Sequence, residues 1–565
     1  MSRSLSVLIL ASLITALLSG CAGVSFPKSE QRSAEAAGAA VDYDDARPTR
    51  SSPARDQPAP EPMTERESPA SHAPAGPQEA PHDFREVEEA ESAQPDTGGV
   101  EQLPPEDPVS NAEGYEDYGV NTFMDPSKDR LSTFAIDVDT ASYTIARRKL
   151  EEGTLPPSSA VRVEEFVNFF RYDYKQPDGQ TPFNVDFEAA PSPFDPDHTF
   201  LRVGVQGLEV AADKRPPVHL VFLVDTSGSM QTPDKIGLLK QALTLLVENL
   251  RPDDTVALAT YAGSTTKVLD PTSVREKGVI ISAIARLEAG GSTAMANGLQ
   301  LAYDMAYKNL KPEHINRVIV CSDGDANVGP SSHEEILRTI RDYTQEGVTL
   351  STIGFGMGNY KDTMMEQLAN QGNGNYYYID TFKQAEQIFQ TDLVGTLMVI
   401  AKDVKIQVEF NPESVESYRL LGYENRDIAD KDFRNDAVDA GEIGAGHSVT
   451  AIYELKLKPS SKIDPATVRI RHKAPEGGRA AETTYAFPRD QVRADFGQSG
   501  RAFQLAVSVA AFAEILRRSP FAADWNLGKV RAMAANAAGD DAREQELVRL
   551  IDIAVRLSDG PRAER

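Results

Sequence analysis

Five oxygen-bearing side chains lie in three short segments in the middle of the chain, and together they could hold a metal ion. They are Asp225, Ser227, Ser229, Thr293 and Asp323. Two carboxylates and three hydroxyls form an oxygen-only donor set, which suits a hard cation such as Mg²⁺, with Mn²⁺ or Ca²⁺ as alternatives. Gly228 permits a tight turn that aims both serine hydroxyls at one ion. Because hydroxyl ligands carry no charge, an acidic group from outside could complete the coordination shell.

The segments around these residues alternate between strands and helices. Residues 218–224 form a nearly continuous apolar run, as in a parallel strand buried on both faces, and Asp225 follows directly. Further strands are predicted over 255–261, 317–322, 348–355 and 375–379, with helices over 233–250, 276–287, 294–310, 332–346, 363–369 and 382–398. This order predicts an α/β domain with a mostly parallel sheet and helices on both faces. Ligands of such sheets bind beyond the carboxyl ends of the strands, where the five side chains fall.

Each of the three segments alone is weak evidence, because serine- and aspartate-rich turns often only cap helices. Together they resemble the metal-ion-dependent adhesion site of von Willebrand factor type A (VWA) domains. The resemblance implies that the five residues are the metal ligands, some of them through water, and that residues 217–398 form a Rossmann-like VWA domain. Ala326 and the pair Met295-Ala296 depart from the family pattern beside the ligands. We expect these departures, and Tyr360 nearby, to affect which partner fits rather than metal binding.

The segments on either side of 217–398 are predicted to form one β-rich base that carries the VWA domain as an insertion. Strands are expected over 134–139, 183–188, 200–207, 404–410, 448–457, 468–472 and 483–487, with helices over 146–153 and 163–170. We therefore predict an α+β flanking region over 111–216, a β-rich region over 399–490 and a helical region over 491–565. Residues 131–143 and 402–412 also resemble bacterial lipoproteins that carry a VWA domain, so the resemblance covers residue 119 to the carboxyl end.

Two further carboxylates, Asp137 and Asp139, follow the first predicted strand of the base. They could ligate a metal ion. Carboxylates at the end of a strand commonly cap the next helix, and we expect that role here.

The amino-terminal residues predict export and a lipid anchor. Arg3 precedes an apolar run over residues 5–18, which is too short for a membrane-spanning helix, so residues 1–20 are a predicted signal peptide. The ending Leu18-Ser19-Gly20-Cys21 resembles a bacterial lipobox, which implies lipidation of Cys21; an ordinary signal peptide is the alternative. Ala22 then favours the outer membrane by resemblance to lipoprotein sorting. Residues 21–110 contain 14 of the 36 prolines and 19 acidic residues, which predicts a disordered acidic linker or, alternatively, an acidic interaction tail.

The composition and the absence of known catalytic motifs argue against several classes of function. With 58 basic and 85 acidic residues, the formal charge of −27 argues against a nucleic-acid partner. The two cysteines exclude a disulfide framework. No motif of a zinc protease or a serine hydrolase is present, and Ser227 would need a distant histidine to act as a nucleophile, so we expect no enzyme. The expected function is a lipid-anchored cell-envelope protein that binds an acidic residue of a protein partner through the metal. The alternative is an envelope assembly factor or structural lipoprotein in which the metal only stabilises the fold.

Overall fold

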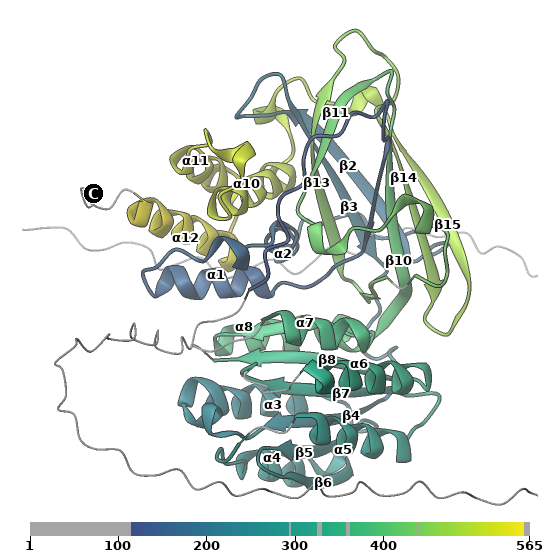
Figure 1. Cartoon of the computed structure of the whole chain (residues 1–565), viewed down its shortest axis with the longest axis vertical. Coiled ribbons are helices and arrows are strands. Elements are labelled where there is room, and N and C mark those ends of the chain that lie inside the picture. The colour runs from purple at the N-terminus through teal and green to yellow at the C-terminus, as the bar shows by residue number, and fades with distance from the viewer. Residues whose placement is uncertain (1–114, 293–294, 325–329, 357–361, 439, 559–565) are drawn as a thin grey trace, which may run out of the picture. The chain divides into compact units, whose positions relative to one another are not determined.

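The computed structural model of the chain describes residues 115–292, 295–324, 330–356, 362–438 and 440–558 (Figure 1). All of them belong to one compact unit of the chain, residues 101–565. The predicted signal peptide, Cys21 and the linker over 21–110 lie outside the described residues, as do Thr293, Ala326 and Tyr360.

A six-stranded sheet occupies the middle of the chain. Its strands are β4 (Val218–Asp225), β5 (Thr255–Tyr261), β6 (Thr265–Ser273), β7 (Ile315–Ser322), β8 (Val348–Phe355) and β9 (Tyr376–Ile379). The order across the sheet is β6-β5-β4-β7-β8-β9. Only β6, at one edge, runs antiparallel to its neighbour, and the other pairs are parallel. The predicted mostly parallel sheet is therefore confirmed.

Helices cover both faces of this sheet (Figure 1). They are α3 (Leu238–Asn249), α4 (Lys277–Ala285), α5 (Met295–Lys308), α6 (Pro330–Gln345), α7 (Asp362–Gln371), α8 (Phe382–Glu386) and α9 (Leu393–Leu397). Strand β4 shows why the apolar run is continuous. Leu220 and Phe222 pack in the core shared with α3 and α4, whereas Val221 and Leu223 pack in the core shared with α5 and α6. Successive side chains of a strand point to opposite faces, so both faces of β4 must be apolar.

The single helix predicted over 382–398 is wrong in detail. The chain forms α8, then a π-helical turn over Gln387–Thr391, and then α9. The backbone N–H of Asp392 donates to the carbonyl of Gln387, which closes the wider turn. The break directs the Asp392 carboxylate to Arg171, a residue of the flanking region, with which it forms an ion pair.

The segments before and after this six-stranded sheet and its helices form two antiparallel sheets that share one core. One sheet contains β1 (Leu131–Ala135), β10 (Val399–Phe410), β14 (Ala466–Ala474), β15 (Gly477–Phe487) and the short β12 (Ile443–Gly444). The other contains β2 (Phe183–Pro191), β3 (Thr199–Gly207), β11 (Val415–Leu421) and β13 (Ser448–Leu457). Strand β1 pairs with β10, and β3 pairs with β13. Because each of these pairs joins a strand that precedes the six-stranded sheet to one that follows it, the predicted insertion of the α/β domain in a β-rich base is confirmed.

A group of helices packs beside these two sheets (Figure 1). It combines α1 (Ala141–Glu151) and α2 (Val163–Asn168) with α10 (Arg501–Leu516), α11 (Leu527–Ala537) and α12 (Ala542–Ser558). Tyr143 of α1, Phe166 of α2 and Phe512 of α10 lie in one apolar cluster. The expected carboxyl-terminal helical segment is therefore present. None of the helices in the described part of the chain is long and apolar enough to cross a bilayer.

Candidate metal-binding site

The first part of the candidate site is the turn that follows strand β4. Asp225 ends the strand with no exposed surface, and Ser227 is 2% exposed. Oδ1 of Asp225 accepts a hydrogen bond from the backbone N–H of Ser227 at 2.8 Å, which fixes the direction of the turn. The hydroxyl oxygens of Ser227 and Ser229 lie 2.9 Å apart. The turn thus brings together the two hydroxyls that the sequence pattern predicted to share an ion.

Asp323 lies at the corresponding end of strand β7. Strands β4 and β7 are parallel neighbours in which Val224 pairs with Cys321, so Ser322 comes beside Asp225 and Asp323 follows one residue later at the same edge. Ser322 bridges the two strands, because its hydroxyl donates to Oδ2 of Asp225 at 2.9 Å. Burial raises the pKa of Asp225, and the nearby charge of Asp323 adds to this shift. Two buried carboxylates that repel each other form a site where a cation is electrostatically favoured.

The third predicted ligand, Thr293, lies outside the described residues, so its place in the site stays a prediction. The segment just before it is described and is fastened to the turn after β4. The backbone N–H of Gly228 donates to the carbonyl of Gly291 at 3.0 Å, and that of Gly290 donates to the carbonyl of Thr226 at 2.7 Å. This loop therefore leads toward the aspartates and serines.

The donor set fits a hard divalent cation better than a transition metal. Within the described ranges, no three histidine, cysteine or acidic side chains gather at a point that could hold a metal ion. The site instead offers two carboxylates and two serine hydroxyls, and oxygen donors of this kind are the ligands that Mg²⁺ and Ca²⁺ prefer. Cys321 is buried in β7, where its side chain packs in the apolar core shared with α3 and α4, and burial raises the pKa of its thiol.

The sequence did not reveal Lys235, a positively charged residue that contacts the candidate site. Its ammonium nitrogen lies 2.9 Å from Oδ2 of Asp323 in a buried ion pair. A lysine in the first turn of a predicted helix is usually solvated, so nothing in its immediate sequence pointed to the site. Tyr261 was missed as well: its side chain is fully buried beside Asp225, and burial raises the pKa of its hydroxyl.

The expectation that Asp137 and Asp139 cap helix α1 is wrong, because no side chain caps that helix at its N-cap residue. Asp139 accepts a hydrogen bond from the backbone N–H of Tyr376 at 3.0 Å. Arg426 lies 3.3 Å from Oδ1 of Asp137, 3.0 Å from Oδ2 of Asp139 and 3.1 Å from Oε1 of Glu366. Burial and the charge of Asp137 raise the pKa of Asp139. These carboxylates join the α/β domain to its base through one arginine.

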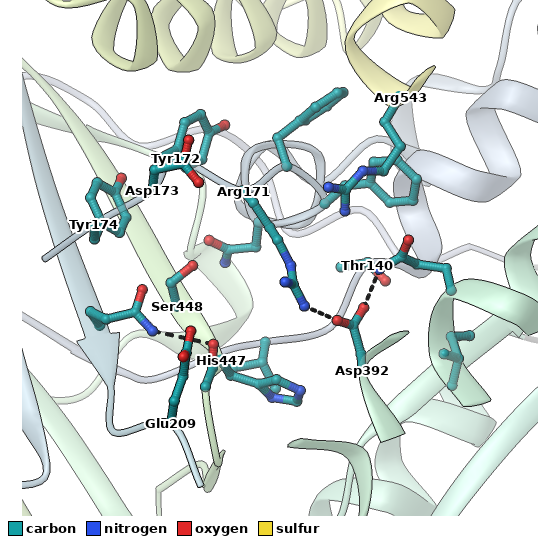
Figure 2. Close-up of a pocket in the computed structure, with 18 of the residues that line it drawn as sticks. Thr140, Arg171, Tyr172, Asp173, Tyr174, Glu209, Asp392, His447, Ser448 and Arg543 are labelled. Atoms are coloured by element: carbon teal, nitrogen blue, oxygen red, sulfur yellow. Dashed lines mark hydrogen bonds and ion pairs between the residues drawn. The ribbon is translucent and has the colours of Figure 1, made fainter. Parts of the chain in front are cut away.

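A cavity of about 310 Å³ lies at a second contact between the VWA domain and the base (Figure 2). Figure 2 shows Arg171 and Asp392 pointing toward one another, with His447 below them. Asp392 pairs with Arg171 and accepts a hydrogen bond from Nε2 of Gln387 at 2.6 Å. Burial lowers the pKa of His447, which keeps its imidazole neutral at pH 7. The charged groups of the cavity thus anchor the end of the VWA domain, away from the candidate metal site.

Comparison with protein families divides the chain into three matched parts. The model "von Willebrand factor" matches residues 109–202, and the von Willebrand factor type A domain matches residues 219–391. A third model, the carboxyl-terminal part of the uncharacterized protein YfbK, matches residues 395–557. The middle of the chain, with its parallel sheet, is accordingly a VWA domain.

Individual relatives match the chain beyond the VWA domain, in the segments that precede and follow it. The chain is 37% identical over 473 residues to the uncharacterized protein YfbK of Escherichia coli (strain K12), covering 79% of this chain and 81% of that protein. The chain therefore belongs to the YfbK family of VWA-domain proteins. It is also 26% identical over 278 residues to inter-alpha-trypsin inhibitor heavy chain H3 of Bos taurus, covering 46% of this chain and 30% of the relative. Among solved structures, a von Willebrand factor type A protein from Catenulispora acidiphila aligns with a TM-score of 0.41 and 17% identity, covering 67% of this chain and 91% of that one.

Proposed function

We propose that this VWA protein is a lipid-anchored component of the cell envelope that binds a protein partner through a divalent cation. The cation, Mg²⁺ in the first instance, is held by Asp225, Ser227, Ser229, Thr293 and Asp323. The observation that carries the proposal is the meeting of the turn after β4 with Asp323 at the carboxyl edge of the sheet. The proposed activity is binding, with no chemical conversion of the partner.

The partner is expected to supply an aspartate or glutamate to the cation. Two carboxylates balance the charge of a divalent ion, while neutral hydroxyls leave it an affinity for one more oxygen ligand. The chain itself has a formal charge of −27, so it does not attract acidic proteins through its overall charge. Recognition would therefore depend on the local positive centre and on the loops around it.

Ser229→Ala tests the proposal against the alternative that the metal only stabilises the fold. Ser229 contributes one hydroxyl, which lies 2.9 Å from that of Ser227, and the substitution leaves the buried carboxylates in place. We expect the wild-type protein to capture its partner from solubilised envelopes with Mg²⁺ but not with a chelator. Ser229→Ala should capture none in either condition and should melt at the wild-type temperature.

The matched control is Ser282→Ala, which removes an exposed serine hydroxyl on α4 and should retain capture. The outcome that favours the structural alternative is a lower melting temperature of Ser229→Ala in Mg²⁺ with capture of the partner unchanged. Capture that is equal with and without the chelator would contradict the adhesion proposal.

The membrane anchor is tested separately at Cys21. We expect the mature protein to begin at this residue and to carry acyl chains, because the signal segment ends in a lipobox-like sequence. Two or more acyl chains bury enough methylene groups for stable anchoring. Mass spectrometry of the intact protein from envelopes would detect the added mass. Cleavage at another position, or an unmodified amino terminus, would contradict the anchor.

A further inference from the structure

Lys235 lies within the candidate metal site although it is not one of the predicted ligands. It belongs to the π-helical turn Pro233–Gly237, which connects the serine-containing turn after β4 to helix α3. Its Nζ is 2.9 Å from Oδ2 of Asp323. The exposed fractions of the two side chains are 10% and 2%. The ammonium group is thus held on a buried carboxylate that the proposed function assigns to the cation.

The path of the lysine side chain is built into the fold. Its stem passes over Gly356, the residue after strand β8, where a β-carbon would overlap Cγ, Cδ and Cε of Lys235. Gly356 also has a φ of +83°, a conformation that L side chains rarely adopt. A glycine therefore permits both the turn and the close passage of the lysine. Lys240, on α3, is different: its Nζ donates to the carbonyl of Ala285 near the surface.

We propose that Lys235 is an internal cation that competes with the divalent ion for Asp323 and so sets the metal affinity of the site. This inference rests on the proposed function, because it concerns the same ligand. One carboxylate oxygen cannot give its full charge to an ammonium and a divalent ion together. The two cations also repel each other strongly where solvent is largely excluded. A divalent ion must therefore displace the ammonium from Asp323 when it binds.

The same arrangement favours divalent over monovalent ions. A sodium or potassium ion brings one positive charge to Asp323, which is the charge that Lys235 already supplies. Only an ion of higher charge gains electrostatic energy from the exchange, since it interacts with Asp225 and Asp323 together. Lys235 is in this sense a selectivity-determining residue. Lys235 also neutralises Asp323, whose negative charge would otherwise be buried without this ion pair next to that of Asp225.

The test is the affinity of the full chain for MgCl₂ and MnCl₂, measured by isothermal titration calorimetry with wild type, Lys235→Met and Lys240→Met. Methionine keeps an unbranched stem over Gly356 and removes the charge. We expect Lys235→Met to bind both ions at least about tenfold more tightly, because the competing charge is gone. Lys240→Met should bind like the wild type. Lys235→Gln, which keeps a polar donor without charge, should also bind more tightly.

Thermal melting provides a second measurement that separates the outcomes. In chelator, Lys235→Met should melt below the wild type, because the buried ion pair between Lys235 and Asp323 is lost. Mg²⁺ should raise the melting temperature of the variant by more than it raises that of the wild type. Equal affinities for wild type, Lys235→Met and Lys235→Gln would overturn the role of Lys235 and leave the metal site intact. Absence of cation binding in all of these proteins would overturn the proposed function and this inference with it.

Discussion

Asp323→Ala is expected to weaken Mg²⁺ and Mn²⁺ binding by about a hundredfold or more and to abolish partner capture. Asp323 supplies one of the two negative charges at the site. Because it is only 2% exposed, solvent does not compensate for the loss of this charge. Isothermal titration calorimetry on the purified chain measures the affinity, and envelope pull-down measures capture. The control is Asp270→Ala, which removes an exposed carboxylate paired with Lys267 at the edge strand and should change neither. Capture retained by Asp323→Ala would contradict a role for the metal.

The double variant Asp323→Ala/Lys235→Met separates ligand loss from damage to the fold. In the single Asp323→Ala variant, the ammonium of Lys235 stays in a largely buried place without its carboxylate, which lowers stability. Removing both charges should restore part of the melting temperature, and metal binding should remain lost. A double-mutant cycle of this kind isolates the interaction between the two side chains. Recovery of cation binding in the double variant would show that Asp323 is not a ligand.

The middle domain could be predicted from sequence because its central strands are buried on both faces of the sheet and are therefore nearly continuous apolar runs. Strand β4 is apolar at every position from Leu220 to Val224, and the strand bounds expected over 255–261 and 348–355 are those of β5 and β8. Strand β6 was not predicted, since it is a polar, half-exposed edge strand that contains Pro271. Edge strands carry little of the pattern that burial imposes, so local sequence does not reveal them.

The candidate site could be predicted only where its ligands are close together in the sequence or follow directly from the order of the strands. Asp225, Ser227 and Ser229 form a motif within five residues, and the parallel sheet then brings Asp323 beside them. Lys235 could not be found in this way, because its contact with Asp323 depends on a π-helical turn and on Gly356 at another strand end. Gly356, directly after β8, is compatible with a close approach of another side chain, but the sequence does not identify that side chain as Lys235.

The contacts between the VWA domain and its base could not be predicted either. Arg426 contacts Glu366 across 60 residues of sequence, and Arg147 contacts Asp380 across 233. Charged residues at such separations give no periodic pattern. Their partners follow from the tertiary fold, so the local sequence around Asp137 and Asp139 indicates helix caps and gives no sign of Arg426.

Arg419 connects the base to the carboxyl-terminal helices, and its loss is expected to have the largest effect on stability. This fully buried side chain on β11 lies 2.8 Å from Glu454 on β13 and 2.9 Å from Glu514 on α10. Its guanidinium also lies 4.5 Å from the ring centre of Phe521. Although burial raises the pKa of Glu514, the charges of Arg517 and Arg419 lower it overall. Arg517 and Arg419 together thus favour the ionised form of the buried Glu514 carboxylate.

Arg419→Met should lower the free energy of unfolding by about 3–5 kcal/mol, because two buried carboxylates lose a shared partner. The chain's single tryptophan, Trp525, reports on this region, since it stacks on Phe194 with ring centres 4.4 Å apart. Tryptophan fluorescence during urea unfolding therefore measures the effect. Arg434→Met is the matched control: it breaks the more exposed pair with Glu482 and should cost no more than about 1 kcal/mol.

The pH dependence of this difference distinguishes lost charge pairing from lost packing. In the wild type the lowered pKa of Glu514 contributes stability that is present above the ordinary glutamate pKa and is lost as the pH falls through the lowered value. In Arg419→Met the Glu514 carboxylate loses one of the two positive charges that lower its pKa, so protonation relieves part of the cost of burying it. The difference in unfolding free energy between wild type and variant should therefore be greatest near pH 7 and should shrink toward pH 4. A difference that stays constant over this range would mean that the packing of Arg419 against Phe521, and not its charge, stabilises the contact between β11 and α10.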